Sequence, residues 1–137
     1  MFRPVLAVEY EPAAPASPGS VPDGDGIPGT PLTLAKTPGT PIRLSWGAGC
    51  AAAGGEEYAV YEGTLGSWNQ RFSVVCGTGG QRTHDVNPAP GGTYYLVVPV
   101  RSDLQREGSY GRRSGGAERT PGTSVCFVQL LDDPICP

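Results

Sequence analysis

The stretch that decides the fold is residues 86–101, which read VNPAPGGTYYLVVPVR. Residues 87–92 combine two prolines with two glycines, a composition typical of a turn. Residues 93–101 follow, rich in aromatic and β-branched side chains, and they predict the strongest strand of the chain. No segment keeps a sustained helical period, so the predicted fold is all-β.

Shorter strands are predicted on both sides of this one, at regular intervals. The alternation of apolar and polar residues indicates strands at 31–35, 42–46, 58–62, within 68–76 and at 82–86. A last strand is expected within 110–119 or within 124–130. Short strands separated by Gly- and Pro-rich turns are typical of a β-sandwich.

The N-terminal part has a different composition. Nine of the 15 prolines lie in residues 1–41, and residues 12–29 show no apolar period, so we expect an extended connector there. Before it, four apolar side chains share one face at period two, which is a strand pattern without a nearby partner: Phe2, Leu6, Val8 and Tyr10. The predicted organisation is an arm with its connector at residues 1–29 and a sandwich at residues 30–137.

Charge and hydropathy exclude two classes of partner. The net charge of −3 and the pI near 5.0 argue against nucleic acid, because phosphate binding needs a basic surface. No stretch approaches the ~18 apolar residues of a membrane span. Residues 1–11 are too short for a signal peptide, so we expect a secreted form to have lost its signal already.

The cysteines indicate a compartment. An even number of cysteines in a small chain, with no CxxC spacing, favours two disulfides over a zinc site. Disulfides form in oxidising surroundings, so we expect an extracellular or cell-surface protein. Free buried thiols are the alternative. The cysteines are Cys50, Cys76, Cys126 and Cys136.

Several motifs together resemble a known domain. LSW at 44–46, YAVYEG at 58–63 and GTYYLVV at 92–98 are similar to strands of fibronectin type III domains. GSYG at 108–111, followed by Ser114, is similar to the run that leads into their last strand. The chain is thus identified as a fibronectin type III-like, immunoglobulin-like antiparallel β-sandwich, preceded by an extended Pro/Gly-rich N-terminal arm.

The resemblance assigns roles to core residues. It implies that Trp46 and Tyr58 fill the core, and that Tyr95 is the corner tyrosine whose hydroxyl bonds back to the upstream backbone. Pro99 departs from the pattern, because proline cannot donate to a β-ladder. A bulge or a free edge is therefore expected at Pro99.

A narrower resemblance concerns the cysteines. The segments around residues 22–32, 61–66 and 108–119 resemble cysteine-containing domains of bacterial secreted proteins. In those domains, a Cys after the Trp strand and a Cys before the fifth strand occur together. The resemblance implies a Cys50–Cys76 disulfide, which leaves Cys126–Cys136 as the second.

Catalytic and metal chemistry have little support. His84 is the sole histidine, and no nucleophile elbow accompanies it, so we expect no enzyme and no cofactor. Asp23 and Asp25 resemble half of a calcium loop, but a hard cation needs more oxygen ligands. We therefore expect no metal.

Aromatic residues suggest a sugar platform, because aromatic faces stack on carbohydrate C–H surfaces. The candidates are Trp68, Tyr61 and Tyr110. Packing in the core or at an edge is the alternative that this interpretation has to exclude.

The strongest strand also predicts an apolar outer face. If Tyr95 and Val97 point inward, a set of apolar side chains points outward on neighbouring strands: Tyr61, Leu96, Val98 and Val100. Such a patch needs a cover. The cover is either a docking partner or the C-terminal tail around Val128, Leu130 and Leu131.

Two functions follow from these patterns. The first is a structural subunit of an extracellular bacterial filament, in which the arm of one copy docks on the sandwich of the next. The second is an adhesion or carbohydrate-binding module of a secreted protein, with the arm as a linker. Self-association into a homo-polymer is the expected partnership, and glycans are the second possibility. The Ser/Thr/Pro-rich connector is also a candidate for O-linked sugars.

Overall fold

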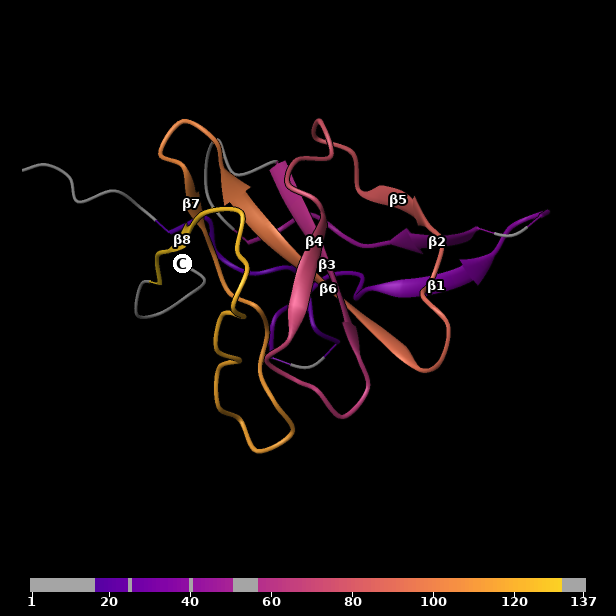
Figure 1. The fold of residues 1–137 in the computed structure, drawn as a ribbon. Helices are drawn as coiled ribbons and strands as arrows, with labels where there is room; N and C mark the ends of the chain where they lie inside the picture. Colours follow the sequence, from indigo (N-terminus) through magenta and orange to yellow (C-terminus); the bar gives the residue numbers. More distant parts are fainter. Residues whose placement is uncertain (1–16, 25, 40, 51–56, 132–137) are drawn as a thin grey trace, which may run out of the picture.

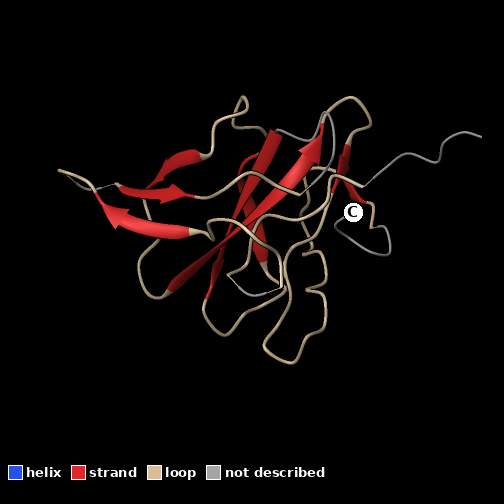
Figure 2. Ribbon diagram, turned by 180° about the vertical axis from the view of Figure 1, so that it is seen from behind, coloured by secondary structure: helices blue, strands red, loops and turns tan. Residues whose placement is uncertain are grey.

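A computed structural model describes residues 17–24, 26–39, 41–50 and 57–131 of the 137-residue chain. The described residues contain strands and loops, and none of them forms an apolar helix of membrane-spanning length (Figure 2). The predicted all-β class is therefore confirmed. The arm residues Phe2, Leu6, Val8 and Tyr10 lie outside the described part, and so does Cys136.

The strands lie close to the predicted positions, and their bounds are β1 (Thr33–Lys36), β2 (Ile42–Ser45), β3 (Glu57–Thr64), β4 (Arg71–Val75), β5 (Thr83–Val86), β6 (Thr93–Arg101), β7 (Arg106–Glu107) and β8 (Val128–Gln129). The six strands predicted up to residue 101 are confirmed. β7 is a two-residue strand that the pattern did not indicate, because two residues carry no period. β8 falls within the predicted 124–130, whereas 110–119 holds only a bridge between Arg112 and Glu118.

Two sheets divide the strands, in the orders β1-β2-β5 and β4-β3-β6-β7-β8, consistent with a β-sandwich (Figure 1). All neighbours are antiparallel except β7 and β8, which are parallel. The β3–β6 ladder is the longest, from Glu57 opposite Val100 to Thr64 opposite Thr93. The predicted strongest strand is therefore the centre of the larger sheet.

The main core lies between the two sheets. Trp46 and Tyr58 meet edge to face, with ring centroids 5.5 Å apart at 72°. Tyr95 is also buried, so the predicted core positions of all three aromatic residues are confirmed. The remaining buried members of the cluster come from both sheets and from the N-terminal segment: Val21, Leu44, Val60, Val86 and Val97.

The outer face of the larger sheet is covered from within the chain. Tyr61, Val98 and Val100 are buried, and Leu96 is partly buried. Tyr110, Cys126 and Phe127 of the C-terminal segment pack over them. The prediction that this face is open to a neighbouring copy is therefore wrong. The alternative of a C-terminal cover holds, although residues 110 and 126–127 contribute to it and the exposed Val128 does not.

The predicted boundary at residue 30 is also wrong, because residues 17–22 are buried in the sandwich. Cys50 donates a backbone hydrogen bond to the Ser20 carbonyl (2.9 Å), and Ser109 donates one to the Gly19 carbonyl (2.8 Å). Val21 joins the main core. A segment without apolar period can be buried when loops on both sides satisfy its backbone, and we call residues 17–22 the clamped segment.

Pro99 produces neither a bulge nor a free edge. Gly108 donates to the Pro99 carbonyl (2.9 Å), as the ladder requires. The Gly108 carbonyl, which would accept from an N–H at position 99, accepts from the side-chain amide of Gln129 instead (3.2 Å). The missing donor of proline is thus replaced by a side chain from β8.

The clamped segment generates a prediction about Gly108. A Cβ at this position would collide with the carbonyl oxygen of Gly19. Replacing Gly108 with Ala should therefore lower the free energy of unfolding by about 1–3 kcal/mol, as overpacking does. Gly115→Ala is the matched control, since nothing lies within 4 Å of its added Cβ. Equal unfolding curves of the two variants in denaturant would contradict the burial of residues 17–22.

Candidate functional site

A groove opens where the β3–β4 loop, β6 and the hairpin of residues 109–119 meet. Its volume is about 460 Å³, which lies within the ~300–1,000 Å³ typical of ligand sites. The loop and the hairpin lie beside each other at the lower side of the molecule in Figure 1. The side chains used below come from these elements and from the first residue of β4: Trp68, Arg71, Tyr94, Leu96, Arg113 and Arg119.

The rim of the groove is aromatic. Trp68 is 57% exposed, and its ring centroid lies 5.1 Å from that of Tyr94, at an angle of 45°. The Tyr94 hydroxyl donates to the Trp68 carbonyl (3.0 Å), which ties the loop to β6. Gly63 lies opposite Tyr94 on β3, and a Cβ there would collide with the ring. The glycine therefore lets the tyrosine lie flat across the sheet.

The floor of the groove is a buried cation. Arg71 is 4% exposed, and its guanidinium donates to the carbonyls of Trp68 and Thr120. The guanidinium carbon also lies 5.1 Å from the centre of the Tyr110 ring. The buried Nε has no hydrogen-bond partner among the described residues. None of the described carboxylates forms an ion pair with Arg71, so its charge is balanced only by dipoles and a ring.

Two further arginines stand on the hairpin. Arg113 and Arg119 line the groove, and neither pairs with a carboxylate in the described ranges. Two backbone hydrogen bonds close the hairpin: the Arg113 N–H donates to the Ala117 carbonyl (2.7 Å), and the Arg119 N–H donates to the Gly111 carbonyl (2.8 Å). No acidic residue appears among the described lining residues. The groove is therefore positively charged although the whole chain is acidic.

Glu118 holds the hairpin against the sandwich. One carboxylate oxygen accepts from the Ser109 hydroxyl (2.7 Å), and the other accepts from the Tyr110 backbone N–H (2.8 Å). A carboxylate that accepts two such bonds orders the backbone around it. The arginines thus project from a braced hairpin.

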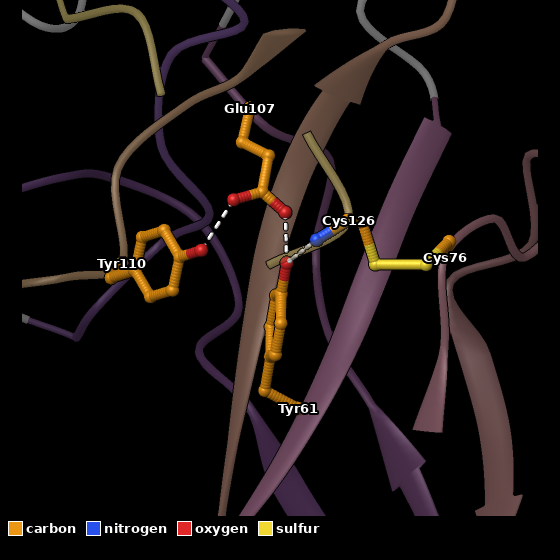
Figure 3. The surroundings of a disulfide bond; sticks show 5 residues. All are labelled: Tyr61, Cys76, Glu107, Tyr110 and Cys126. Carbon is orange, nitrogen blue, oxygen red and sulfur yellow. Dashed lines mark hydrogen bonds between the residues drawn. A yellow bond between two sulfur atoms is a disulfide. The ribbon is translucent and has the colours of Figure 1, made fainter. Parts of the chain in front are cut away.

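Beneath the hairpin, a buried carboxylate joins two tyrosines (Figure 3). Glu107 is fully buried, and its two oxygens accept from the hydroxyls of Tyr61 and Tyr110. The Tyr61 hydroxyl in turn accepts from the Cys126 N–H (2.8 Å). Burial raises the pKa of Glu107, although the tyrosine hydroxyls oppose the shift. Burial likewise raises the pKa of Tyr61 to about 12 and moves the pKa of Tyr110 upward.

The disulfide next to this cluster joins Cys76 and Cys126, with Cα atoms 5.6 Å apart (Figure 3). The implied pairing of Cys50 with Cys76 is therefore wrong, and so is that of Cys126 with Cys136. The Tyr61 hydroxyl holds the backbone of Cys126 beside the end of β4, where Cys76 lies. Cys50 is also disulfide-bonded.

The predicted sugar platform is only partly present. Tyr61 and Tyr110 are buried, with ring centroids 5.4 Å apart, so they cannot stack on a ligand. Trp68 is exposed, but its partner is Tyr94, which sequence reasoning missed. The alternation of side chains along β6 could have indicated Tyr94, because Tyr94 lies on the same side of the strand as Leu96, which was predicted to point outward.

The corner tyrosine uses a side chain in place of the backbone. The Tyr95 hydroxyl donates to the Glu62 carboxylate (2.9 Å), and the same carboxylate accepts from the Ala89 N–H (3.3 Å). Tyr95 thus reaches the upstream turn through Glu62, whereas the resemblance implied a direct bond. Burial, with Glu62 beside it, raises the pKa of Tyr95 to about 12.

The other candidate residues lie apart from the groove. His84 is on β5, opposite Leu44, in the smaller sheet. The Asp23 carboxylate accepts from the Ile27 N–H (3.0 Å), and Asp25 is outside the described ranges. The structure describes no group of three or more His, Cys, Asp or Glu side chains suited to a metal ion.

We compared the chain with known protein families, curated proteins and solved structures. No family model matches the chain, and neither the curated proteins nor the solved structures contain a match.

The buried carboxylate predicts a pH dependence. A folded-state pKa above the ordinary 4.5 means that the folded protein holds a proton that the unfolded chain releases. Stability is therefore lost as pH rises above 4.5 through the raised pKa. Glu107→Gln should remove this loss, so the melting temperature of the wild type should fall relative to the variant across that window. Parallel pH profiles of the two proteins would refute the assignment.

The disulfide predicts a fragment and a stability change. Digestion without reduction should release a peptide pair joined through Cys76 and Cys126. Replacing both with Ser should lower the free energy of unfolding by about 4 kcal/mol, because the bond spans 50 residues. A peptide pair joined through Cys50 and Cys76 would contradict the Cys76–Cys126 bond.

Proposed function

We propose that the protein is an extracellular structural subunit: a fibronectin type III-like sandwich that assembles head to tail through its N-terminal arm. Assembly of this kind would build a filament or surface appendage, because a head-to-tail contact that does not close generates an open chain. The disulfide between Cys76 and Cys126 supports an oxidising compartment.

The division of strands supports the fibronectin type III-like part of the proposal. In immunoglobulin-like sandwiches of the constant type, the first, second and fifth strands share one sheet, and the third, sixth and seventh share the other. Here β1, β2 and β5 form one sheet, while β3, β6 and β7 belong to the other. The fourth strand differs, since β4 lies beside β3.

The observation that carries the assembly proposal is the clamped segment. Because residues 17–22 are buried, the described part of the chain begins at a fixed point of the sandwich, and 16 residues precede it in the sequence. The apolar side chains of the arm cannot pack on the outer face of the larger sheet, since Tyr110 and the residues around Cys126 already cover it. A second copy is the simplest source of another surface for them.

A second candidate function is carbohydrate binding, and the exposed Trp68 favours it. An indole that is 57% exposed beside a groove suits stacking on a sugar ring. In this case the protein would be an accessory module, and the isolated chain would be a monomer. Loss of binding on a glycan array by Trp68→Ala, with unchanged melting temperature, would support this function.

The arm provides the test of assembly. Replacing Leu6 or Val8 with Asp should abolish self-association, because an unpaired carboxylate is strongly disfavoured in an apolar contact. Arg3→Gln, on the opposite face of the predicted strand, is the control and should assemble like the wild type. Sedimentation velocity and negative-stain microscopy of the full chain measure the outcome. If the Asp variants assemble normally, the arm is not the docking element and this function is excluded.

A further inference from the structure

We propose that the aromatic and basic groove is the receiving site for residues 9–15 of a second copy of the chain. This inference rests on the proposed function and names the two surfaces that meet. The occupant reads EYEPAAP and lies just before the clamped segment. Three properties of the groove fit this peptide: its charge, its aromatic rim and its position on the molecule.

The charges are complementary. Glu9 and Glu11 are the acidic residues of the arm, and the groove presents Arg113 and Arg119 without an acidic partner in the described part of the chain. Arg–carboxylate pairs form two parallel hydrogen bonds, which fixes the orientation of the bound peptide as well as adding affinity. The groove is thus suited to an acidic peptide.

The buried cation on the floor points the same way. Arg71 is held by carbonyl oxygens and a ring, and its Nε is buried without a partner. A buried charge without a counter-charge is costly, so an anion arriving near it is favoured. Arg71 is therefore a buried part of the groove floor, unlike an incidental cluster of surface arginines.

The prolines of the arm suit the aromatic rim. Pro12 and Pro15 are three residues apart, which places them on one face of a polyproline II helix. Proline-rich segments bind grooves lined by aromatic rings, because the helix is preformed and loses little entropy. Trp68 and Tyr94 provide such a pair of rings. Pro12 and Pro15 would pack against the exposed side of this pair, with the small alanines turned outward.

The position of the clamped segment favours a second copy as the source of the peptide. Gly19 lies at the Pro99 end of β6, since both contact Gly108. Tyr94 lies five residues further along that strand, or ~17 Å. Pro15 precedes Gly19 by four residues, a reach of at most ~14 Å. Pro15 therefore falls short of Tyr94 in its own chain, whereas the groove of a neighbour is free of this limit.

The main test is a charge exchange in the full chain. The double variant Arg113→Glu with Arg119→Glu should weaken self-association at least about tenfold, equivalent to about 1.4 kcal/mol. Glu9→Arg with Glu11→Arg should weaken it similarly. The chain that carries all four changes should assemble again, because the pairs are restored with opposite sign. Sedimentation measures each, and melting temperatures check that every variant is folded.

The matched control is Arg112→Glu. Arg112 is exposed on the same hairpin but does not line the groove, so its reversal should leave assembly unchanged. A synthetic EYEPAAP peptide provides a second readout. It should quench or shift the fluorescence of the exposed Trp68 in the wild type, and the response should disappear in the Arg113/Arg119 variant. Pro12→Ala with Pro15→Ala in the peptide should weaken the response.

The outcomes separate this inference from the proposed function. If Leu6→Asp abolishes assembly but the charge variants assemble normally, the arm docks elsewhere and this inference is overturned while the proposed function stands. If the wild type is a monomer that still responds to the peptide through Trp68, the groove is right but assembly is not. A monomer that ignores the peptide and binds saccharides through Trp68 would overturn both.

Discussion

The rest of the structure depends on the carboxylate of Glu107, buried between two tyrosine hydroxyls. It holds Tyr110 against Tyr61, and the backbone carbonyl of Glu107 accepts from Leu130 (2.8 Å). Tyr110 and the segment around Cys126 are thereby held over the outer face of the larger sheet. A buried carboxylate is tolerated only where each of its oxygens is satisfied, so this cluster admits one arrangement of the C-terminal segment. The disulfide at Cys126 closes the same arrangement covalently.

The position of the C-terminal segment both covers the outer face of the larger sheet and forms part of the groove. With the C-terminal segment in place, the outer face of β3 and β6 is no longer available for docking. The same segment carries the hairpin that supplies Arg113 and Arg119 to the groove. The C-terminal segment therefore both covers the sheet and supplies the arginines of the groove. The acidic chain acquires a local positive site because the acids nearest the hairpin are used internally, Glu118 in bracing it and Glu107 beneath it.

The clamped segment changes the interpretation of the N-terminal region. Prolines and glycines without a period normally indicate a connector, yet residues 17–22 are as buried as the core strands. Their burial is supported by backbone groups of Cys50 and Ser109, which lie far away in the sequence. Residue 17, where the described part begins, is therefore held at a fixed point of the sandwich.

The sequence by itself determined the all-β class, the position of six strands and the inward side of the strongest one, because alternation at period two is a local property of the backbone. The resemblance to fibronectin type III domains implied that Trp46, Tyr58 and Tyr95 lie in the core, and they are buried there. Only the tertiary structure decided that Tyr61 is covered and Trp68 is not, since alternation assigns a side of a sheet but not what packs on that side. The tertiary structure likewise decided that Cys76 meets Cys126. Disulfide pairing depends on which Cα atoms come within reach in space, and the spacing along the chain carries no record of that.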